Sequence, residues 1–375
     1  MARRVETVQH QNNPRRRVTI ADIALRAGVS KGAVSYALNG RPGLSEPTRR
    51  RILEISEELG WYPNSAARAL SAAVAGACGL VLSRPARTLA FEPFFMELMA
   101  GIEAELSSRS VALTIQVVDD LEAEMAVYRR WWAEHRVDGV LVKDLWVVDP
   151  RISQIEQLGL PAVVIGGPEG TGSLSAVWSD DAGAVVEVVR YLARLGHVRI
   201  ARVAGVPEFL HTEIRTEAFL ATMAELSLSP EVVTTDYTAE SGAQVTRQLL
   251  TNRRPPTAIV YDNDVLAVAG LGVAHEMGLS VPADVSLVGW DDSLYTQAVH
   301  PPLTAVRRDI VAMGMHAASA LLALIGDGTV TRVGEPSGQL IPRGTTARPP
   351  AVASAPARRP RVVASRQRRT TNNGA

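Results

Sequence analysis

Residues 19–40 read TIADIALRAGVSKGAVSYALNG, and this stretch decides the fold of the N-terminal part of the chain. Thr19 and Asp22 have the spacing of a capping box, so a helix is expected to begin there. Gly28 permits the left-handed conformation that ends a helix, and the Ser30 hydroxyl can cap the next one. The stretch therefore predicts two short helices joined by a tight turn, which is a helix-turn-helix.

The second helix of this pair has an apolar side and an outward side. Val34, Ala37 and Leu38 recur at helical spacing and are expected to face the first helix. The N-terminal part of such a second helix enters the major groove of DNA. Lys31 and Tyr36 can contact bases there or be ordinary solvated residues. The residues expected at the DNA are Thr19, Ser30, Lys31, Gly32, Ser35, Tyr36 and Asn39.

A third helix is expected to begin at Ser45 and to end at Gly60, with Pro47 in its first turn. Its apolar residues can complete a small core with the first two helices. The segment that follows runs from Pro63-Asn64 to Leu70.

These pieces resemble the lactose/galactose repressor family of bacterial transcription regulators, and the resemblance extends to about residue 346. The resemblance implies that residues 64–70 form a hinge helix that is ordered when two protomers bind an operator. Asn64 and Ala67 would lie at the DNA, and Leu70 would be the apolar wedge inserted into a minor-groove step. Tyr36 stands where many relatives carry arginine, so the operator sequence stays open.

Charge is segregated along the chain, although acids and bases number 39 each. Residues 1–70 hold twelve Lys and Arg against six Asp and Glu, and residues 347–375 hold seven Arg and no acid. Residues 71–346 hold 20 bases against 33 acids. A basic module attracts the DNA backbone, whereas an acidic body is repelled by it.

The motifs, the family resemblance and the composition together divide the chain into five parts. Residues 1–17 are expected to be a basic flexible N-terminus, 18–63 the helix-turn-helix domain, and 64–75 the hinge helix with a small-residue linker. Residues 76–346 are expected to form the effector and dimerisation domain. Residues 347–375 have few large apolar side chains, so a disordered basic tail is expected there.

The compartment is expected to be the cytoplasm, in association with the nucleoid. The only cysteine is Cys78, which excludes an internal disulfide and fits a reducing environment. No secretory signal is recognised after the early arginines, and no run is expected to be long enough to cross a membrane.

Between residues 76 and 346, short β-rich apolar runs alternate with longer amphipathic ones. This rhythm predicts parallel sheets covered by helices on both faces, and its repetition predicts two α/β lobes. Ligands bind such sheets beyond the carboxyl ends of their strands, so a cleft between the lobes is the expected site. Strands are expected at 79–82, 111–118, 139–142, 162–165, 176–178, 200–204, 232–235, 258–261 and 285–288, and helices at 94–106 and 121–134.

The family resemblance implies a fold like that of the periplasmic sugar-binding proteins. Lobe one would comprise 76–179 and 307–335 and carry most of the dimer contact, and lobe two would comprise 180–306 and 336–346. The expected fold class is an N-terminal all-α helix-turn-helix domain followed by a two-lobed α/β effector domain with parallel, Rossmann-like sheets.

The resemblance places the effector at Phe94, Arg215, Asn263, Trp290 and Asp291. A guanidinium and a carboxylate can each bridge two neighbouring hydroxyls, and an amide both donates and accepts, so a carbohydrate effector is expected. The two aromatic residues could instead belong to the core. Asp181 and Glu217 add negative charge near the lobe junction, which makes an acidic or phosphorylated effector less favourable.

The resemblance therefore implies a transcriptional repressor that binds a palindromic operator as a homodimer or higher oligomer and is switched by a small molecule. A solute-binding protein would share the lobes but has no use for residues 19–70. An enzyme would use acids such as Asp180, Asp181 or Asp292, or His197, yet no nucleophile motif, phosphate loop or metal spacing accompanies them. No catalytic residue, metal or cofactor is expected.

Two polar residues are interpreted as helix-end residues. His197 follows Leu195-Gly196 and is expected to lie at a helix end, where its charge suits the dipole. Asp264 is expected to cap the helix that follows the strand at 258–261.

Overall fold

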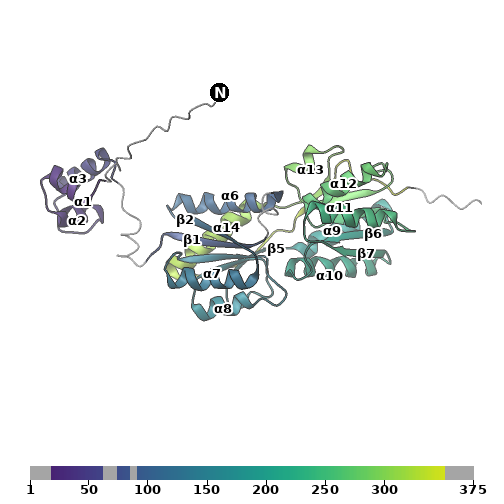
Figure 1. Ribbon diagram of the computed structural model, residues 1–375, viewed down its shortest axis with the longest axis horizontal. Coiled ribbons are helices and arrows are strands. Elements are labelled where there is room, and N and C mark those ends of the chain that lie inside the picture. Colours follow the sequence, from purple (N-terminus) through teal and green to yellow (C-terminus); the bar gives the residue numbers. More distant parts are fainter. Residues whose placement is uncertain (1–17, 62–73, 85–90, 351–375) are drawn as a thin grey trace, which may run out of the picture. The chain divides into compact units, whose positions relative to one another are not determined.

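The computed structural model describes residues 18–61, 74–84 and 91–350 and divides into two compact units between Gly76 and Ala77 (Figure 1). The predictions for the N-terminus, for Asn64, Ala67 and Leu70 of the hinge, and for residues 351–375 lie outside the described residues. Each unit is described by itself.

The first unit contains three helices in its described residues: α1 (Ile20–Ala27), α2 (Lys31–Leu38) and α3 (Glu46–Glu58). Their apolar faces meet in one core, in which Ile23, Val34 and Ile52 have no exposed surface. The three-helix prediction is therefore confirmed.

The predicted helix ends of this unit are also formed. The carboxylate of Asp22 accepts hydrogen bonds from the backbone N of Thr19 at 2.8 Å and from the Thr19 hydroxyl at 2.7 Å. Gly28 ends α1 in the left-handed conformation, with φ of 68°. The Ser30 hydroxyl accepts a hydrogen bond from Ala33 N at 3.1 Å and so caps α2.

The second unit begins with a six-stranded sheet, whose order is β11-β5-β4-β3-β1-β2 and whose strands all run parallel. Helices α6 (Pro93–Ser108) and α14 (Ile310–Asp327) pack on one face, and α7 (Leu121–Ala133) and α8 (Pro150–Leu158) pack on the other. The strands are β1 (Ala77–Ser83), β2 (Ala112–Val118), β3 (Gly139–Lys143), β4 (Ala162–Ile165), β5 (Ser175–Ser179) and β11 (Arg332–Glu335). This sheet with its helices is lobe one.

Lobe two is built on a second six-stranded sheet, of order β12-β10-β9-β8-β6-β7, in which only β12 is antiparallel to its neighbour. The strands are β6 (Arg199–Ala204), β7 (Ser229–Thr234), β8 (Ala258–Tyr261), β9 (Ser286–Asp291), β10 (Thr304–Arg307) and β12 (Gln339–Ile341). The helices are α9 (Asp181–Leu195), α10 (Leu210–Glu225), α11 (Ala239–Thr251), α12 (Asp264–Glu276) and the short α13 (Leu294–Ala298). The predicted α/β class with two lobes is confirmed.

The chain passes between the lobes three times within the described residues. It leaves lobe one after β5, returns after β10, and leaves again after β11. These passages bring Ser179, Arg308 and Glu335 to the lobe junction, where they border a shared depression. Every strand expected from the sequence is present, and β10, β11 and β12 lie outside the strand ranges that were expected.

Helix α14 is, among the described helices, the one long and apolar enough by length and composition to cross a membrane. The expectation that no such run exists was therefore wrong. Its packing explains the composition, because α14 lies directly against α6. A Cβ added to Gly101 would lie 2.0 Å from the Val311 oxygen, and one added to Gly314 would lie 2.4 Å from the Leu98 oxygen. The helix also contributes Met313 and Leu321 to the core of lobe one.

Candidate functional site

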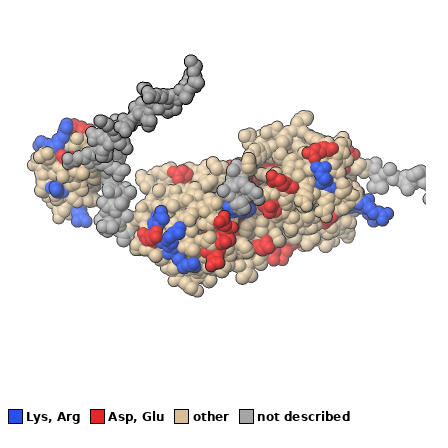
Figure 2. Space-filling view, in the orientation of Figure 1, with Lys and Arg blue, Asp and Glu red and all other residues tan. Residues whose placement is uncertain are grey.

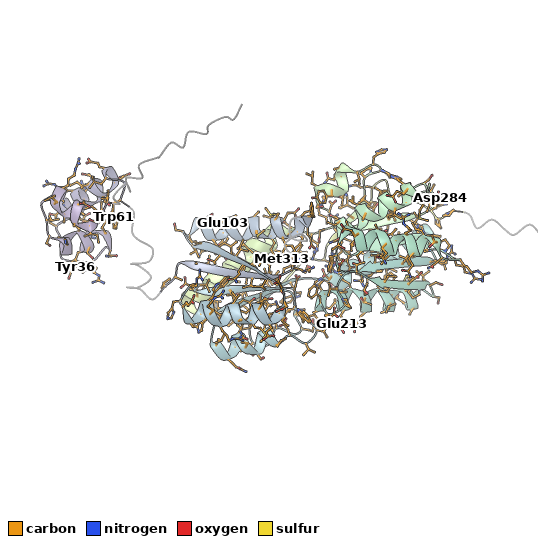
Figure 3. The ribbon with its side chains drawn as sticks, viewed as in Figure 1. Tyr36, Trp61, Glu103, Glu213, Asp284 and Met313 are labelled. Atoms are coloured by element: carbon orange, nitrogen blue, oxygen red, sulfur yellow. The ribbon has the colours of Figure 1, made fainter. Side chains whose placement is uncertain are left out.

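The residues predicted to contact DNA lie at the surface of the first unit. Lys31, Gly32 and Asn39 are exposed, Ser35 is half-buried, and Tyr36 keeps 44% of its surface accessible (Figure 3). Thr19 and Ser30 are exposed at the starts of the first two helices. The N-terminal half of α2 is thus free to approach a partner.

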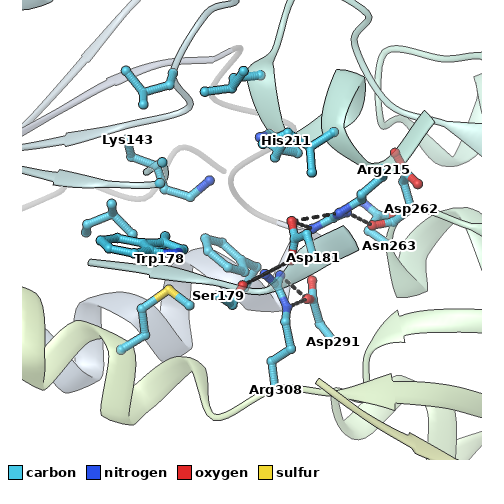
Figure 4. A pocket seen from close by; sticks show the side chains of 18 of the residues that line it. Lys143, Trp178, Ser179, Asp181, His211, Arg215, Asp262, Asn263, Asp291 and Arg308 are labelled. Atoms are coloured by element: carbon cyan, nitrogen blue, oxygen red, sulfur yellow. Dashed lines mark hydrogen bonds and ion pairs between the residues drawn. The ribbon is translucent and has the colours of Figure 1, made fainter. Parts of the chain in front are cut away.

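A cavity with about 760 Å³ of empty space, part of it open to solvent, lies between the two lobes of the second unit (Figure 4). It sits at the carboxyl ends of strands from both sheets. Four of the five predicted effector residues border it: Phe94, Arg215, Asn263 and Asp291. The other charged residues around it are Arg84, Glu92, Lys143, Asp181, Asp262 and Arg308.

Arg215 projects from α10 and is held on several sides. Its Nε donates to the Asp181 carboxylate at 2.9 Å, and its Nη1 donates to the backbone oxygen of Asp262 at 3.2 Å. Burial opposes the charge, but Asp181 and Asp262 raise the pKa of Arg215 above its usual range. The guanidinium is therefore fixed in position and charged.

Trp290 is the predicted effector residue that does not border the cavity. Its ring is 1% exposed and belongs to the core of lobe two. The Arg215 guanidinium lies 4.4 Å from the ring centre, which is cation–π distance. Trp290 thus supports Arg215 from beneath, in place of the expected platform for a sugar ring.

Asp291 stands at the end of β9 with φ of 94°, and Asp292 follows with φ of 61°. Such backbone angles are strained for residues with a Cβ and are typical of functional sites. Asp291 accepts from Arg308 Nε at 2.9 Å, whereas Asp292 accepts from Arg343 Nη2 at 2.8 Å. The strained turn therefore directs two consecutive carboxylates to different partners.

The roles of Asn263 and Asp264 differ from those expected at the start of α12. Asn263 is the residue that caps α12, since its Oδ1 accepts from Leu266 N at 2.9 Å. The Asp264 carboxylate accepts from the backbone nitrogens of Trp290 and Ser293, at 3.0 and 2.7 Å. Asp264 therefore holds the turn that contains Asp291, and the expectation of a capping role for Asp264 was wrong.

Asp181 does not supply the free negative charge that the sequence suggested. Its carboxylate is paired with Arg215 and with Arg308, at 2.9 and 3.4 Å. Burial opposes ionisation, but these two arginines lower the pKa of Asp181 to about 2. Glu217 is exposed and does not border the cavity. The argument from these two acids against an acidic effector therefore fails.

Several cavity residues were missed by sequence reasoning although a signal for some of them existed. Lys143 ends β3, Arg84 follows β1, and Asp262 follows β8. The carboxyl ends of parallel strands point to the ligand side of a sheet, so these positions could have been chosen. The Lys143 ammonium lies 4.4 Å from the centre of the Phe94 ring, and it also pairs with Asp144.

His211 carried no recognisable sequence signal. It pairs through Nε2 with the Tyr237 hydroxyl at 2.9 Å. Burial and the nearby Arg215 charge lower the pKa of His211 well below its usual value. This imidazole is therefore neutral at the wall of the cavity.

The two lobes also touch each other beside the cavity. The Arg84 guanidinium of lobe one lies 4.7 Å from the ring centre of Phe209 and 4.9 Å from that of Tyr237, both in lobe two. Backbone hydrogen bonds also connect the lobes, from Val147 N to the Glu208 oxygen at 3.0 Å and from Leu210 N to the Leu145 oxygen at 2.8 Å. These contacts hold the lobes together around the cavity.

Three buried polar atoms of cavity residues have no hydrogen-bond partner within the described structure. They are Arg84 Nη1, Glu92 Oε2 and Asn263 Nδ2. Buried polar groups are normally satisfied, so such atoms mark places where a bound molecule can complete the hydrogen bonding. Two donors and one carboxylate oxygen suit a ligand rich in hydroxyl groups.

His197 does not act as a charged helix-end residue. Its Nε2 pairs with the Ala347 backbone oxygen and its Nδ1 with the Thr257 hydroxyl, both at 2.9 Å. Burial lowers the pKa of His197, so the neutral ring links the chain after β12 to the body of lobe two. Across residues 18–61, 74–84 and 91–350, no group of three or more His, Cys, Asp or Glu side chains could hold a metal ion.

Comparison with known proteins explains the two-unit arrangement. Residues 19–64 match the model for bacterial regulatory proteins of the lacI family, and residues 189–346 match that for periplasmic binding protein-like domains. The chain is 30% identical over 314 residues to the probable HTH-type transcriptional repressor ExuR of Bacillus subtilis (strain 168), covering 83% of this chain and 92% of that protein. The chain belongs to the LacI family of bacterial regulators.

Two solved LacI-family structures share the fold along most of the chain. The lac repressor dimer bound to operator and the anti-inducer ONPF has a TM-score of 0.79 and 26% identity, covering 88% of this chain and all of that one. The complex of the regulator CelR with cellobiose has a TM-score of 0.67 and 28% identity, with the same coverage. This LacI-family chain is therefore a DNA-binding transcriptional regulator with an effector domain, and not an enzyme.

Proposed function

We propose that this regulator is a repressor that binds a palindromic operator as a homodimer and is switched by a carbohydrate in the cavity between its lobes. The observation that carries the carbohydrate is the set of buried, unpartnered polar atoms of Arg84, Glu92 and Asn263. The cellobiose complex of CelR shows that a relative of the same fold binds a sugar. We expect the protein to act in the cytoplasm, on the nucleoid.

At the DNA, the exposed half of α2 would enter the major groove. Lys31 and Tyr36 would reach bases or phosphates there, with Ser35 and Asn39 beside them. Tyrosine cannot repeat the bidentate contact that arginine makes with guanine, so the operator should differ from those of relatives with arginine at position 36. By the family resemblance, Asn64, Ala67 and Leu70 would contact the minor groove.

Homodimer formation is supported by apolar side chains left at the surface of lobe one. Ile115 and Val117 lie on the edge strand β2, on the same face of the sheet as α6. Each of them remains 44% exposed. Met96 of α6 and Met315 of α14 are 62% and 39% exposed. A second copy that covers these residues would pair the two DNA-binding units, as a palindrome requires.

Acidic side chains are spread over both lobes on the face seen in Figure 2.

The proposed switch couples lobe closure to DNA affinity. A sugar that completes the hydrogen bonding of Arg84 and Asn263 favours the state in which the lobes touch. The paired first lobes then shift relative to each other and change the distance between the two hinge segments. Closure either releases DNA or promotes its binding, and both directions are compatible with the same cavity.

A two-step experiment tests this function. A thermal-shift screen of the full chain against sugars identifies stabilising ligands, and operator binding is then measured with each of them. We expect at least one sugar to raise the melting temperature and to change operator affinity by about 5- to 150-fold, the usual range of allosteric coupling. If no sugar does either, the carbohydrate part of the proposal is wrong.

A further inference from the structure

Glu92 differs from the other carboxylates around the cavity. Asp181, Asp262 and Asp291 each accept hydrogen bonds from an arginine, at 2.9, 2.7 and 2.9 Å. Glu92 has no ion pair within the described part of the chain, although it is only 8% exposed. It immediately precedes α6, and its side chain does not cap that helix. The carboxylate is therefore available to a ligand.

Arg84 offers the complementary group beside it. Its Nε and Nη2 are occupied by Asp144, at 3.0 and 2.9 Å, and its Nη1 has no partner. Burial raises the pKa of Glu92, and Asp144 and Asp291 raise it further, whereas the nearby charges of Arg84 and Lys143 favour the ionised form. The cavity thus presents a donor and an acceptor that do not bond to each other.

A hydroxyl is a chemical group that suits each of these two atoms. A hydroxyl can donate to Glu92 Oε2 and accept from Arg84 Nη1, because it carries one hydrogen and two lone pairs. A carboxylate or phosphate could accept from Arg84, but it would bring a second anion to Glu92, and juxtaposed like charges are strongly unfavourable in a buried site. Arg215 and Arg308 already pair with aspartates, and Lys143 pairs with Asp144.

We infer that Glu92 is a specificity-determining residue, which admits neutral, hydroxyl-bearing sugars and excludes uronic acids and sugar phosphates. This inference rests on the proposed function, since it concerns the same cavity and the same class of effector. Glu92 takes the place of Asp181 and Glu217 as the residue that discriminates against acidic ligands, because Asp181 is paired with arginines and Glu217 does not border the cavity.

Calorimetric titration of the full chain with matched ligand sets tests the inference. Each set contains a neutral sugar, its uronic acid and its phosphate, built on glucose, galactose, maltose and cellobiose. We expect the neutral member of at least one set to bind about 100-fold more tightly than its acidic counterparts. In Glu92→Gln the ratio of neutral-sugar to acidic-sugar affinity should fall at least tenfold, because the amide keeps the shape of the side chain and removes its charge. Glu103→Gln, on the exposed side of α6, should leave it unchanged (Figure 3).

The outcomes separate the two proposals. Binding of no sugar in any set contradicts the proposed function. Tighter binding of an acidic member by the unaltered protein, or an unchanged ratio in Glu92→Gln, overturns the role of Glu92 and leaves a sugar effector intact. Thermal unfolding without ligand verifies that Glu92→Gln is folded. If Glu92→Gln is not folded, the test uses the ratio of neutral-sugar to acidic-sugar affinity in the unaltered protein and in Glu92→Ala. This ratio should be smaller in Glu92→Ala than in the unaltered protein.

Discussion

The two sites of this regulator hold their polar residues in opposite ways. On the first unit, Lys31 and Tyr36 are exposed at the surface. In the cavity, Arg215, Asp181 and Asp291 are at least 90% buried, and Arg215 and Asp291 are connected through Asp181 and Arg308. A change at the first site should therefore stay local, whereas a change in the cavity should alter several residues at once.

The largest effect is expected for Arg215→Ala. The change removes a cavity donor and leaves the buried Asp181 with Arg308 as its remaining cation, which should cost about 3 kcal/mol of unfolding free energy, the low end for breaking a buried ion pair. Sugar binding should weaken by at least about 100-fold, while operator binding persists without a response to the sugar. Calorimetry and fluorescence anisotropy measure the two activities.

The matched control is Arg190→Ala, which removes an ion pair with Glu225 that is about half exposed. An exposed pair contributes little, so both activities should stay normal. If Arg215→Ala abolished operator binding and sugar binding equally, the two sites would not be separable.

Ile52→Ala should break the first unit alone. Ile52 has no exposed surface and closes the three-helix core, so its truncation should cost about 3 kcal/mol. In so small a unit this loss should largely abolish operator binding. Sugar affinity should remain within about twofold, because the second unit has its own cores. A parallel loss of sugar affinity would contradict the separation of the units.

Lys31→Ala should weaken operator binding by about tenfold without changing stability. If Lys31 contacts a phosphate, the slope of log affinity against log salt should fall by about one. Arg26→Ala, which affects an exposed pair with Glu58 on the same unit, serves as the control. An unchanged affinity and slope in Lys31→Ala would identify Lys31 as an ordinary solvated residue.

The smallest effect is expected for His197→Gln, in the pH dependence of unfolding. Since the folded pKa of His197 lies below its usual value of 6.5, its stabilising contribution is present above that pH and is lost as pH falls. His211 has the same sign. Urea unfolding between pH 7.5 and 5 should show a shallower loss of stability in His197→Gln than in the unaltered protein. An identical slope would contradict the neutral role of His197.

The sequence was most informative where contacts are local. The Gly28 turn and the Ser30 cap depend on neighbours a few residues away, and both are formed as predicted. The alternation of short apolar segments with longer amphipathic segments likewise predicted the sheets, because each buried strand is a continuous apolar stretch. β11 could not be found this way, since it is exposed at a sheet edge.

Cavity chemistry depended on contacts that no local pattern encodes. The pairing of Asp181 with Arg308 joins residues 127 positions apart, and it reverses the charge argument drawn from the sequence. Trp290 lies within β9, and only the packed structure shows Arg215 above its ring. No sequence pattern indicated Glu92. What distinguishes it from the other cavity carboxylates is that no arginine donates a hydrogen bond to it within the described residues.

One measurement tests the central claim most directly. A random duplex library is enriched on the full-length protein, and anisotropy then follows binding of the recovered sequence as neutral sugars are added. The account predicts a palindromic sequence whose affinity changes at least about fivefold with one sugar, and a response that Arg215→Ala loses while keeping the DNA. Recovery of no common sequence, or an affinity unaffected by every sugar, would contradict it.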